Sequence, residues 1–228
     1  MKALMFGGLQ KTSLIDFPDR IATVLFTSGC NLRCPYCHNW RLVLGQREPT
    51  LTEDTVLEVL DSRKRHIDAV VVTGGEPTMH SDLPHFLKKL KEQGFAVKLD
   101  TNGFFPRILE RCLPYVDYIA LDVKTSPEKY RFLGAGDLRD YLDSVDMLRR
   151  GKVDYEFRST VVPGFVDEAD IPRIGELVKG AKRLALQQFV PGDTLNKAFN
   201  NVKPYPPSII AHFAEVLEKY VEEVILRV

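Results

Sequence analysis

The feature that most constrains the fold is a regular alternation between short apolar runs and longer segments with helical periodicity. Seven runs of five to eight residues, most of them rich in β-branched side chains, indicate strands. Several are apolar throughout, which is typical of strands buried on both faces of a parallel sheet. The predicted strands are Ile21–Phe26, Ala69–Thr73, Phe95–Leu99, Tyr118–Val123, Tyr155–Val162, Arg183–Phe189 and Glu223–Val228.

The segments between these strands carry the signals of helices. The first begins with Thr52 and two acidic residues, which suits a helix N-terminus. Others end at Gly94, Gly151 and Gly180, and glycine commonly terminates helices. The predicted helices are Thr52–Arg65, Ser81–Gln93, Pro106–Cys112, Leu138–Arg150, Glu168–Lys179 and Pro207–Tyr220.

Strand and helix alternate along the whole chain, and no linker rich in glycine or serine interrupts the pattern. We therefore predict a single α/β domain over residues 1–228, with parallel strands joined by helical crossovers. The pattern alone fits a partial or full barrel as well as an open doubly wound sheet. Residues 191–207 are the longest irregular stretch, and we predict that they form a functional flap.

Charge and hydropathy narrow the class of protein. The 31 basic residues balance the 31 acidic ones, which gives a formal net charge of 0. Nucleic-acid binding would need a positive excess, so no such partner is expected. No stretch approaches the roughly 20 apolar residues of a membrane span, and no signal peptide is apparent. We expect a cytoplasmic protein without a membrane partner, where close cysteines favour metal or redox chemistry.

Glycines and polar side chains collect where the predicted strands end. Gly74 and Gly75 follow one strand, Asp100 follows the next, and Asp122 ends the one after that. Ligands bind at the carboxyl ends of strands in parallel α/β folds, so these ends predict a site. Further candidates at the same ends are Glu76, Thr101, Asn102, Lys124 and Gln188, and Arg158 lies within a predicted strand.

Three of the four cysteines lie close together, as Cys30, Cys34 and Cys37. Buried core thiols are a poor account, because the intervening residues are typical of a loop. A zinc site usually has four ligands in two pairs, and here no second pair follows. His38 could be a fourth ligand, but its adjacency to Cys37 makes tetrahedral closure awkward. A haem attachment (CxxCH) normally follows export and leaves Cys30 unexplained.

An iron–sulfur cluster accounts better for the spacing. A four-iron cluster normally takes four cysteine thiolates. Three thiolates leave one iron open to a substrate or cofactor, much as catalytic zinc keeps an open position. Cys112 could be a distant fourth ligand. It falls in a predicted helix away from the strand ends, so we expect it to serve packing alone.

The CxxxCxxC spacing and the Gly-Gly-Glu-Pro segment at 74–77 resemble the radical S-adenosylmethionine (SAM) superfamily. Residues 7–39, LDTNG at 99–103, LDVK at 121–124 and FRSTVVPG at 157–164 are similar to activases of glycyl-radical enzymes. Within that group, LQKTSLIDFP at 9–18 and LQQFVPG at 186–192 are most similar to the activating proteins of anaerobic ribonucleoside-triphosphate reductase. The resemblance spans nearly the whole chain.

The resemblance implies a partial TIM-type barrel that holds a [4Fe-4S] cluster near its open rim. Cys30, Cys34 and Cys37 would bind three irons, and SAM would bind the fourth. An electron from a donor such as flavodoxin or ferredoxin would cleave SAM to methionine and a 5′-deoxyadenosyl radical. That radical would take a hydrogen from a glycine of the partner enzyme. The cofactors carry this chemistry, and the protein positions them.

The resemblance also implies roles for residues near the methionine and adenine parts of SAM. Tyr36, with the backbone up to His38, would lie near the adenine, although Tyr36 could simply pack the loop. Backbone at Gly74 and Gly75 could accept from the methionine ammonium, or form only a tight turn. Glu76 could meet that ammonium or bond within its own loop.

Other roles concern charge near the cofactor carboxylate. By resemblance, Asp100, Thr101 and Asp122 could line a monovalent cation site. Lys124 and Arg158 could meet the carboxylate or the ribose, or merely pair with Asp122. Two further residues have alternatives: Asn102 could be only part of a turn with Gly103, and Gln188 stands where some activases have a histidine, so it could bond the ribose but not titrate.

The leading hypothesis is an enzyme that installs a glycyl radical on anaerobic ribonucleoside-triphosphate reductase. One alternative is activation of pyruvate formate-lyase or another glycyl-radical enzyme, and another is radical chemistry on a small molecule. From a different class, the chain could be a non-catalytic iron–sulfur electron carrier. A carrier usually has a complete set of four ligands and needs no glycine-rich strand end.

Overall fold

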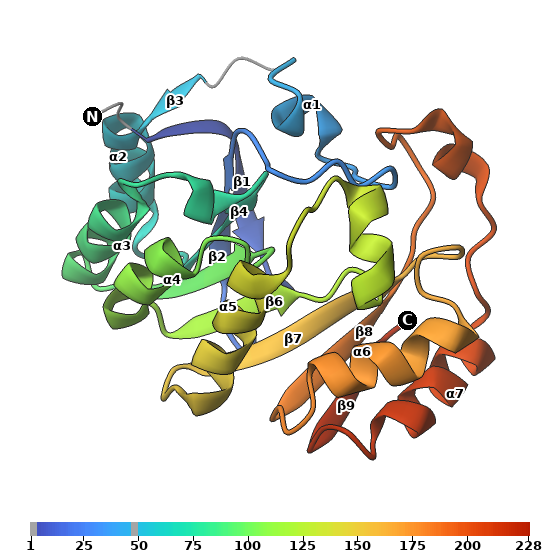
Figure 1. The fold of residues 1–228 in the computed structure, drawn as a ribbon. Helices are drawn as coiled ribbons and strands as arrows, with labels where there is room; N and C mark the ends of the chain where they lie inside the picture. The colour runs from blue at the N-terminus through green and yellow to red at the C-terminus, as the bar shows by residue number, and fades with distance from the viewer. Residues whose placement is uncertain (1–3, 47–49) are drawn as a thin grey trace. The chain divides into compact units, whose positions relative to one another are not determined.

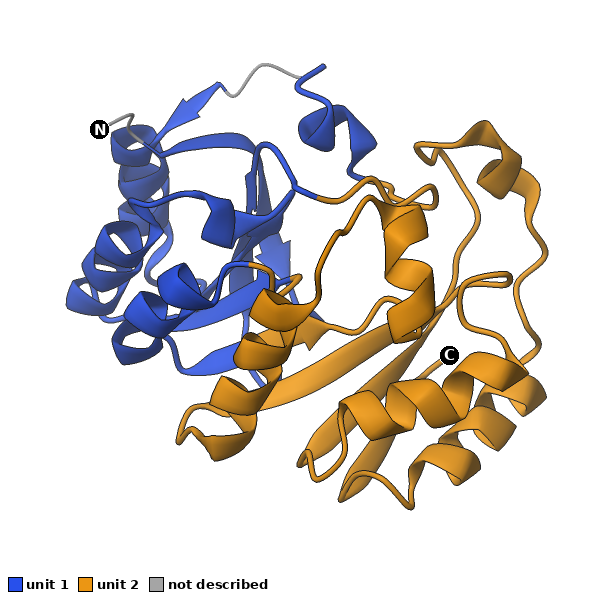
Figure 2. Cartoon of the chain, viewed as in Figure 1, with its two compact units in different colours: residues 1–31, 39–101, 105–119 blue, residues 32–38, 102–104, 120–228 orange. Residues whose placement is uncertain are grey.

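The structure is a computed structural model that describes residues 4–46 and 50–228. The chain forms two compact units, coloured separately in Figure 2. Unit 1 lies within residues 1–31, 39–101 and 105–119, and unit 2 takes residues 32–38, 102–104 and 120–228. The predicted single domain over residues 1–228 therefore stays a prediction, and each unit is described by itself.

Unit 1 is built on strands in the order β3-β1-β2-β4-β5. The central strands β2 (Ala22–Thr27), β4 (Ala69–Gly74) and β5 (Ala96–Thr101) are parallel. The remaining strands, β1 (Met5–Ser13) and β3 (Leu51–Thr52), add antiparallel pairs at one edge. A sixth strand, β6 (Tyr118–Asp122), contains the boundary between the two units.

Helices lie on the crossovers of unit 1 (Figure 1). The longest are α2 (Glu53–Arg63), α3 (Leu83–Glu92) and α4 (Pro106–Cys112), and a short α1 (Trp40–Val43) precedes them. Thr52 caps α2, because its hydroxyl accepts the amide of Thr55 at 3.2 Å. The apolar face of α3 is fully buried, and Phe86 packs its ring 5.0 Å from that of Phe6 in β1.

Unit 2 has the parallel strands β7 (Asp154–Val161), β8 (Arg183–Gln188) and β9 (Glu223–Arg227), in that order. Its helices are α5 (Arg139–Arg150), α6 (Ile171–Leu177) and α7 (Pro207–Leu217). In Figure 1, the orange α6 and red α7 lie together beside β8 and β9. Short 3-10 turns occupy Pro127–Leu133 (η3), Glu168–Asp170 (η4) and Lys197–Asn201 (η5).

The predicted α/β class, with a mostly parallel sheet and helical crossovers, is confirmed. All seven predicted strands are present, with ends that shift by one or two residues. Three differences stand out. The sequence pattern missed β1 and β3, and the helix predicted at Glu168–Lys179 is a 3-10 turn followed by the shorter α6. Within the described residues, no helix has the length and apolar character needed to cross a membrane.

Candidate functional site

The loop that ends at Cys30 interlocks with the loop that follows β4, and both belong to unit 1. The amide of Glu76 donates to the carbonyl oxygen of Gly29 at 2.8 Å. A Cβ atom at Gly75 would lie only 1.8 Å from that same oxygen, so no larger residue fits there without moving the backbone. Gly29 also has a positive φ of 82°, which favours glycine.

Gly74 meets β2 just as closely. Its φ is 117°, and a Cβ atom there would lie 2.4 Å from the amide nitrogen of Thr27. Its carbonyl oxygen accepts a hydrogen bond from Asn39 Nδ2 at 3.1 Å. A carbonyl oxygen has two lone pairs, so one remains for the predicted bond to the methionine ammonium. That bond stays a prediction, while the tight turn is observed.

Glu76 is buried, with 1% of its surface exposed. One carboxylate oxygen, Oε1, accepts the amide of Thr78 at 3.0 Å and the hydroxyl of Thr101 at 2.7 Å. The Thr78 hydroxyl bonds to the same atom. The bond within its own loop is therefore present. It holds the start of the 3-10 turn η1 (Pro77–Met79), and a contact of Glu76 with the cofactor stays a prediction.

Cys34 and Cys37 sit on one tight turn of unit 2. The amide of Cys37 donates to the carbonyl oxygen of Cys34 at 3.1 Å, and Arg33 N donates to Leu133 O at 2.7 Å. Burial raises the pKa of the Cys34 thiol to about 11, and nearby Lys124 offsets only part of that rise. Metal binding would thus have to displace a proton from this thiol.

Tyr36, between these two cysteines, is buried in an aromatic cluster. Its ring centroid lies 5.3 Å from that of Phe165 and 6.2 Å from that of Phe199. Its hydroxyl lies 3.4 Å from the carbonyl oxygen of Lys124, and burial raises its pKa well above the usual value. These contacts pack the loop, and a role near adenine stays a prediction.

Asp122 is held by two cations of the same unit. Arg158 Nε lies 2.8 Å from Oδ1, and Lys124 Nζ lies 3.0 Å from Oδ2. Burial alone would raise the pKa of Asp122, but Arg158 and Lys124 outweigh it and hold that pKa well below its usual range. The predicted ion pairs are therefore present.

A small pocket of about 110 Å³ opens onto this ion pair. It is lined by Tyr36, Asp122, Val123, Lys124, Arg158, Thr160 and Gln187. Two cations and one carboxylate leave a formal charge of +1 on its walls, which suits an anionic group such as a carboxylate. The sequence prediction does not include Thr160, although its place near the end of β7 could have indicated it. Of the two glutamines that end β8, the sequence prediction names Gln188 and not Gln187.

The two glutamines at the end of β8 differ in direction. Gln187 lines the pocket, whereas Gln188 Nε2 donates to the carbonyl oxygens of Tyr205 at 3.2 Å and Phe189 at 3.4 Å. Successive residues of a strand point to opposite faces, which explains the difference. A contact of Gln188 with the ribose stays a prediction.

The remaining candidates have local partners. The exposed His38 ring lies parallel to that of Phe189, with centroids 6.4 Å apart. Asn102 Oδ1 accepts the amide of Phe104 at 3.2 Å, as expected if Asn102 is part of a turn.

Asp100 Oδ1 pairs with the buried Lys98 Nζ at 2.7 Å. Asp100 and Thr101 belong to unit 1 and Asp122 to unit 2, so the cation site stays a prediction.

The donor set fits an iron–sulfur cluster. None of the four cysteines forms a disulfide, and soft thiolates are the ligands that such clusters take. Cys30 belongs to unit 1 and directly follows Gly29, which contacts the loop after β4. Cys34 and Cys37 share a turn of unit 2. Among residues 4–46 and 50–228, no three His, Cys, Asp or Glu side chains form a preassembled metal site. The three-thiolate site therefore stays a prediction.

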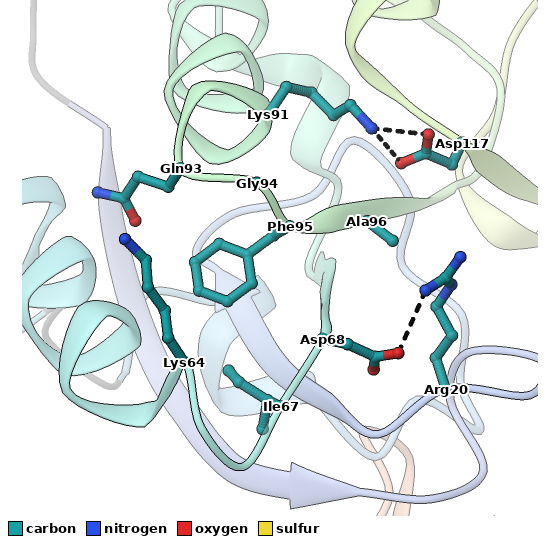
Figure 3. Close-up of a pocket in the computed structure, with 10 residues that line it drawn as sticks. All are labelled: Arg20, Lys64, Ile67, Asp68, Lys91, Gln93, Gly94, Phe95, Ala96 and Asp117. Atoms are coloured by element: carbon teal, nitrogen blue, oxygen red, sulfur yellow. Dashed lines mark hydrogen bonds and ion pairs between the residues drawn. The ribbon is translucent and has the colours of Figure 1, made fainter.

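A larger hollow of about 480 Å³ lies in unit 1, before β4 and β5 begin (Figure 3). Its walls carry the ion pairs Arg20–Asp68, at 3.1 Å, and Lys91–Asp117, at 2.7 Å. These charges neutralise one another in pairs. The hollow thus lies beside the amino ends of those strands, whereas the predicted site residues of unit 1 follow the carboxyl ends.

Residues 24–177 match the Radical SAM superfamily. The whole chain aligns with 97% of a Methanocaldococcus jannaschii protein at 34% sequence identity. That protein is provisionally named a glycyl-radical enzyme activating enzyme. It is also 29% identical to the pyruvate formate-lyase-activating enzyme of Clostridium pasteurianum, over 82% of this chain and 81% of that enzyme.

Solved structures share the fold at low sequence identity. One is TYW1 with a lysine–pyruvate adduct bound, with a TM-score of 0.63 and 16% identity over 88% of this chain and 74% of that one. Another is Streptococcus suis SuiB with its precursor peptide, with a TM-score of 0.65 and 17% identity over 86% of this chain and 45% of that one. The chain therefore belongs to the radical SAM superfamily of enzymes, and within it to the glycyl-radical-enzyme activating group.

Proposed function

We propose that this protein installs a glycyl radical on a partner enzyme, anaerobic ribonucleoside-triphosphate reductase. The observation that carries the proposal is the pocket of unit 2. Its wall includes Tyr36, which separates Cys34 from Cys37, and its charged residues sum to +1. A positively charged pocket whose wall includes the residue between two cysteines suits a cluster-bound cofactor that bears a carboxylate.

Radical SAM enzymes use a [4Fe-4S] cluster and SAM. When bound, these two supply the reductive cleavage that yields the hydrogen-abstracting radical. In this chain, Cys30, Cys34 and Cys37 would hold the cluster. Lys124 and Arg158 would bind the cofactor carboxylate. The glycines at 74 and 75 would let backbone approach the methionine end.

The choice of partner rests on two segments. LQKTSLIDFP at 9–18 and LQQFVPG at 186–192 are most similar to activating proteins of the reductase. A low-potential donor of the flavodoxin or ferredoxin class would supply the electron. The electron transfer and the hydrogen abstraction would both take place in the cytoplasm. A monovalent cation at Asp100, Thr101 and Asp122 would assist the binding of the carboxylate.

A second candidate partner is pyruvate formate-lyase. Two observations favour it: the relative from Clostridium pasteurianum, and an enzyme of Staphylococcus aureus that is 32% identical over 80% of this chain and 78% of its own length. Both are named for activating pyruvate formate-lyase. The cluster and cofactor residues would be the same for either partner. Only an assay with each partner enzyme can therefore distinguish the two candidates.

The test is an anaerobic activation assay with both partners. The iron-loaded protein is mixed with SAM, a reductant and either the reductase or pyruvate formate-lyase, and electron paramagnetic resonance records the glycyl radical. The proposal expects a signal with the reductase and none above background with the lyase. A signal only with the lyase transfers the assignment to the second candidate, and SAM cleavage without a glycyl signal in either arm overturns both.

Two variants provide matched controls for that assay. Cys37→Ala removes a proposed iron ligand and should abolish both iron uptake and the glycyl signal. Cys112→Ala removes a fully buried thiol of α4 and should leave iron uptake unchanged. Loss of the cluster in Cys112→Ala would show that four cysteines, and not three, bind it.

A further inference from the structure

Two backbone hydrogen bonds tie the flap at 191–207 to the turn that carries Cys34 and Cys37. The amide of Leu195 donates to the carbonyl oxygen of Cys37 at 3.1 Å, and the amide of Asn196 donates to that of Pro35 at 2.8 Å. All these residues belong to unit 2. These two bonds hold the backbone of the turn at Pro35, which follows Cys34, and at Cys37 itself.

One side chain sets the conformation of the flap at this place. Asn200 Oδ1 accepts the amide of Thr194 at 3.1 Å and lies 2.8 Å from the Thr194 hydroxyl. Thr194 is fully buried, and its hydroxyl is also 2.9 Å from the carbonyl oxygen of Asn196. These contacts enclose Leu195 and Asn196. The two amides that reach the cysteine turn are thus held in place by the carboxamide of Asn200.

A separate contact between flap and turn does not use that carboxamide. Phe199 packs its ring against Tyr36, at 6.2 Å between centroids, and against Phe165, at 5.9 Å. Removing the Asn200 side chain leaves all three rings unchanged. A variant at Asn200 therefore isolates the hydrogen-bonded part of the contact from its aromatic part.

We infer that Asn200 is a positioning residue for the cysteine turn. It holds the flap so that the amides of Leu195 and Asn196 keep Cys34 and Cys37 oriented and shielded for the cluster. The flap therefore stabilises the conformation of the cysteine turn. The inference rests on the proposed three-thiolate site, and it adds a residue 163 positions away from Cys37 to that site's support.

The test compares three variants with the wild-type protein. Asn200→Ala removes the carboxamide, Asn200→Asp keeps an oxygen that can accept from Thr194, and Asn201→Ala alters an exposed neighbour. The first measurement is the alkylation rate of each cysteine in the iron-free protein under anaerobic conditions, resolved by mass spectrometry. The second is the rate of iron release from the loaded protein to a chelator.

We expect Asn200→Ala to raise the alkylation rate of Cys34 by about threefold to tenfold, the scale of one part-buried neutral hydrogen bond. Cys112, which is fully buried in unit 1, should keep its wild-type rate and so reports that the fold is intact. Iron release should accelerate in the same variant. Asn200→Asp should restore most of both values, and Asn201→Ala should match the wild-type protein.

Three results would overturn the inference. The first is an alkylation rate of Cys34 that does not change in Asn200→Ala. The second is an equal rise in the alkylation rate of Cys112, which would indicate general unfolding. The third is faster alkylation without faster iron release, because the contact would then not serve the cluster. None of these measurements involves SAM or a partner enzyme, so failure to form a glycyl radical would count against the proposed function alone.

Discussion

Arg158 Nε lies 2.8 Å from Asp122 Oδ1, which neutralises the carboxylate and leaves Lys124 as the source of the pocket's net positive charge. The pair is mostly buried, with 16% of the Arg158 side chain and 23% of the Asp122 side chain exposed. A cation that is held in place and shielded from water binds an anion more strongly than one on the surface does. The charged groups of the pocket therefore hold one another in place.

Arg158→Met should weaken SAM binding. The substitution lowers the formal charge of the pocket from +1 to 0, because Lys124 is then left to balance Asp122. A charge-assisted hydrogen bond contributes about 1.5–3 kcal/mol, so we expect a dissociation constant at least about tenfold higher. Equilibrium dialysis with labelled SAM and the iron-loaded protein measures it. Arg131→Met, at an exposed position, is the control, and equal affinity in the two variants would refute the role given to Arg158.

Gly75→Ala should destabilise unit 1 by about 2 kcal/mol or more, in the range of substitutions that force a backbone shift. The added methyl group would meet the carbonyl oxygen of Gly29 at 1.8 Å, and backbone atoms cannot yield as a flexible side chain can. Gly136→Ala is the matched control, because no atom lies within 4 Å of a Cβ placed there. Urea unfolding of both variants measures their free energies of unfolding. Equal values would contradict the close contact between Gly75 and the carbonyl oxygen of Gly29.

The iron-free protein should lose stability as the pH rises above about 9. The pKa of Cys34 moves from 9.0 to about 11 on folding, because burial disfavours the thiolate. Its contribution to stability is complete below the unfolded pKa and is lost as the pH rises through the folded one. At pH 10 that loss is on the order of 1 kcal/mol.

Urea unfolding of the wild-type protein and of Cys34→Ala at pH 8 and pH 10 measures this contribution. Cys34→Ala lacks the titrating thiol, so its stability should fall by less over the same interval. Groups that lie far from Cys34 titrate alike in both proteins, so their effects cancel in the comparison. Identical losses in the two proteins would show that Cys34 is not buried as described.

Gln187→Ala and Gln188→Ala should differ in kind. Gln187 lines the pocket, so its loss should raise the dissociation constant of SAM by about threefold to tenfold, the scale of one neutral hydrogen bond. Gln188 donates to the carbonyl oxygen of Tyr205, so its loss should loosen the flap while the affinity for SAM changes little. Hydrogen exchange of the flap and dialysis with SAM separate the two effects. The reverse assignment would support the ribose contact predicted for Gln188.

The sequence predicted most of the fold because the buried strands carry uninterrupted apolar runs. Val70, Val71 and Val72 of β4 are fully buried, as the pattern requires. β1 escaped prediction because Gly7 and Gly8 interrupt it and polar residues follow them. Its strand character comes from pairing with β2 and β3, which is a tertiary contact that local patterning does not encode.

The site was predictable where spacing or strand ends marked it, and not where distant segments meet. The cysteine spacing and the glycines at 74 and 75 led to the family, and the prediction of an enzyme rather than an electron carrier is confirmed. The face of β8 was harder to predict, since two successive glutamines end it and either could face the pocket. The bonds from Leu195 and Asn196 to the cysteine turn join backbone groups, which leave no signal in the sequence.

Transfer of deuterium from the partner's glycine would show whether this protein takes a hydrogen atom from that residue. Anaerobic ribonucleoside-triphosphate reductase is produced with glycine deuterated at its α-carbon and is mixed anaerobically with the iron-loaded protein, SAM and reductant. Mass spectrometry then determines the isotopic content of the 5′-deoxyadenosine that forms. We expect 5′-deoxyadenosine that carries deuterium. Unlabelled 5′-deoxyadenosine, formed while SAM is consumed, would contradict it.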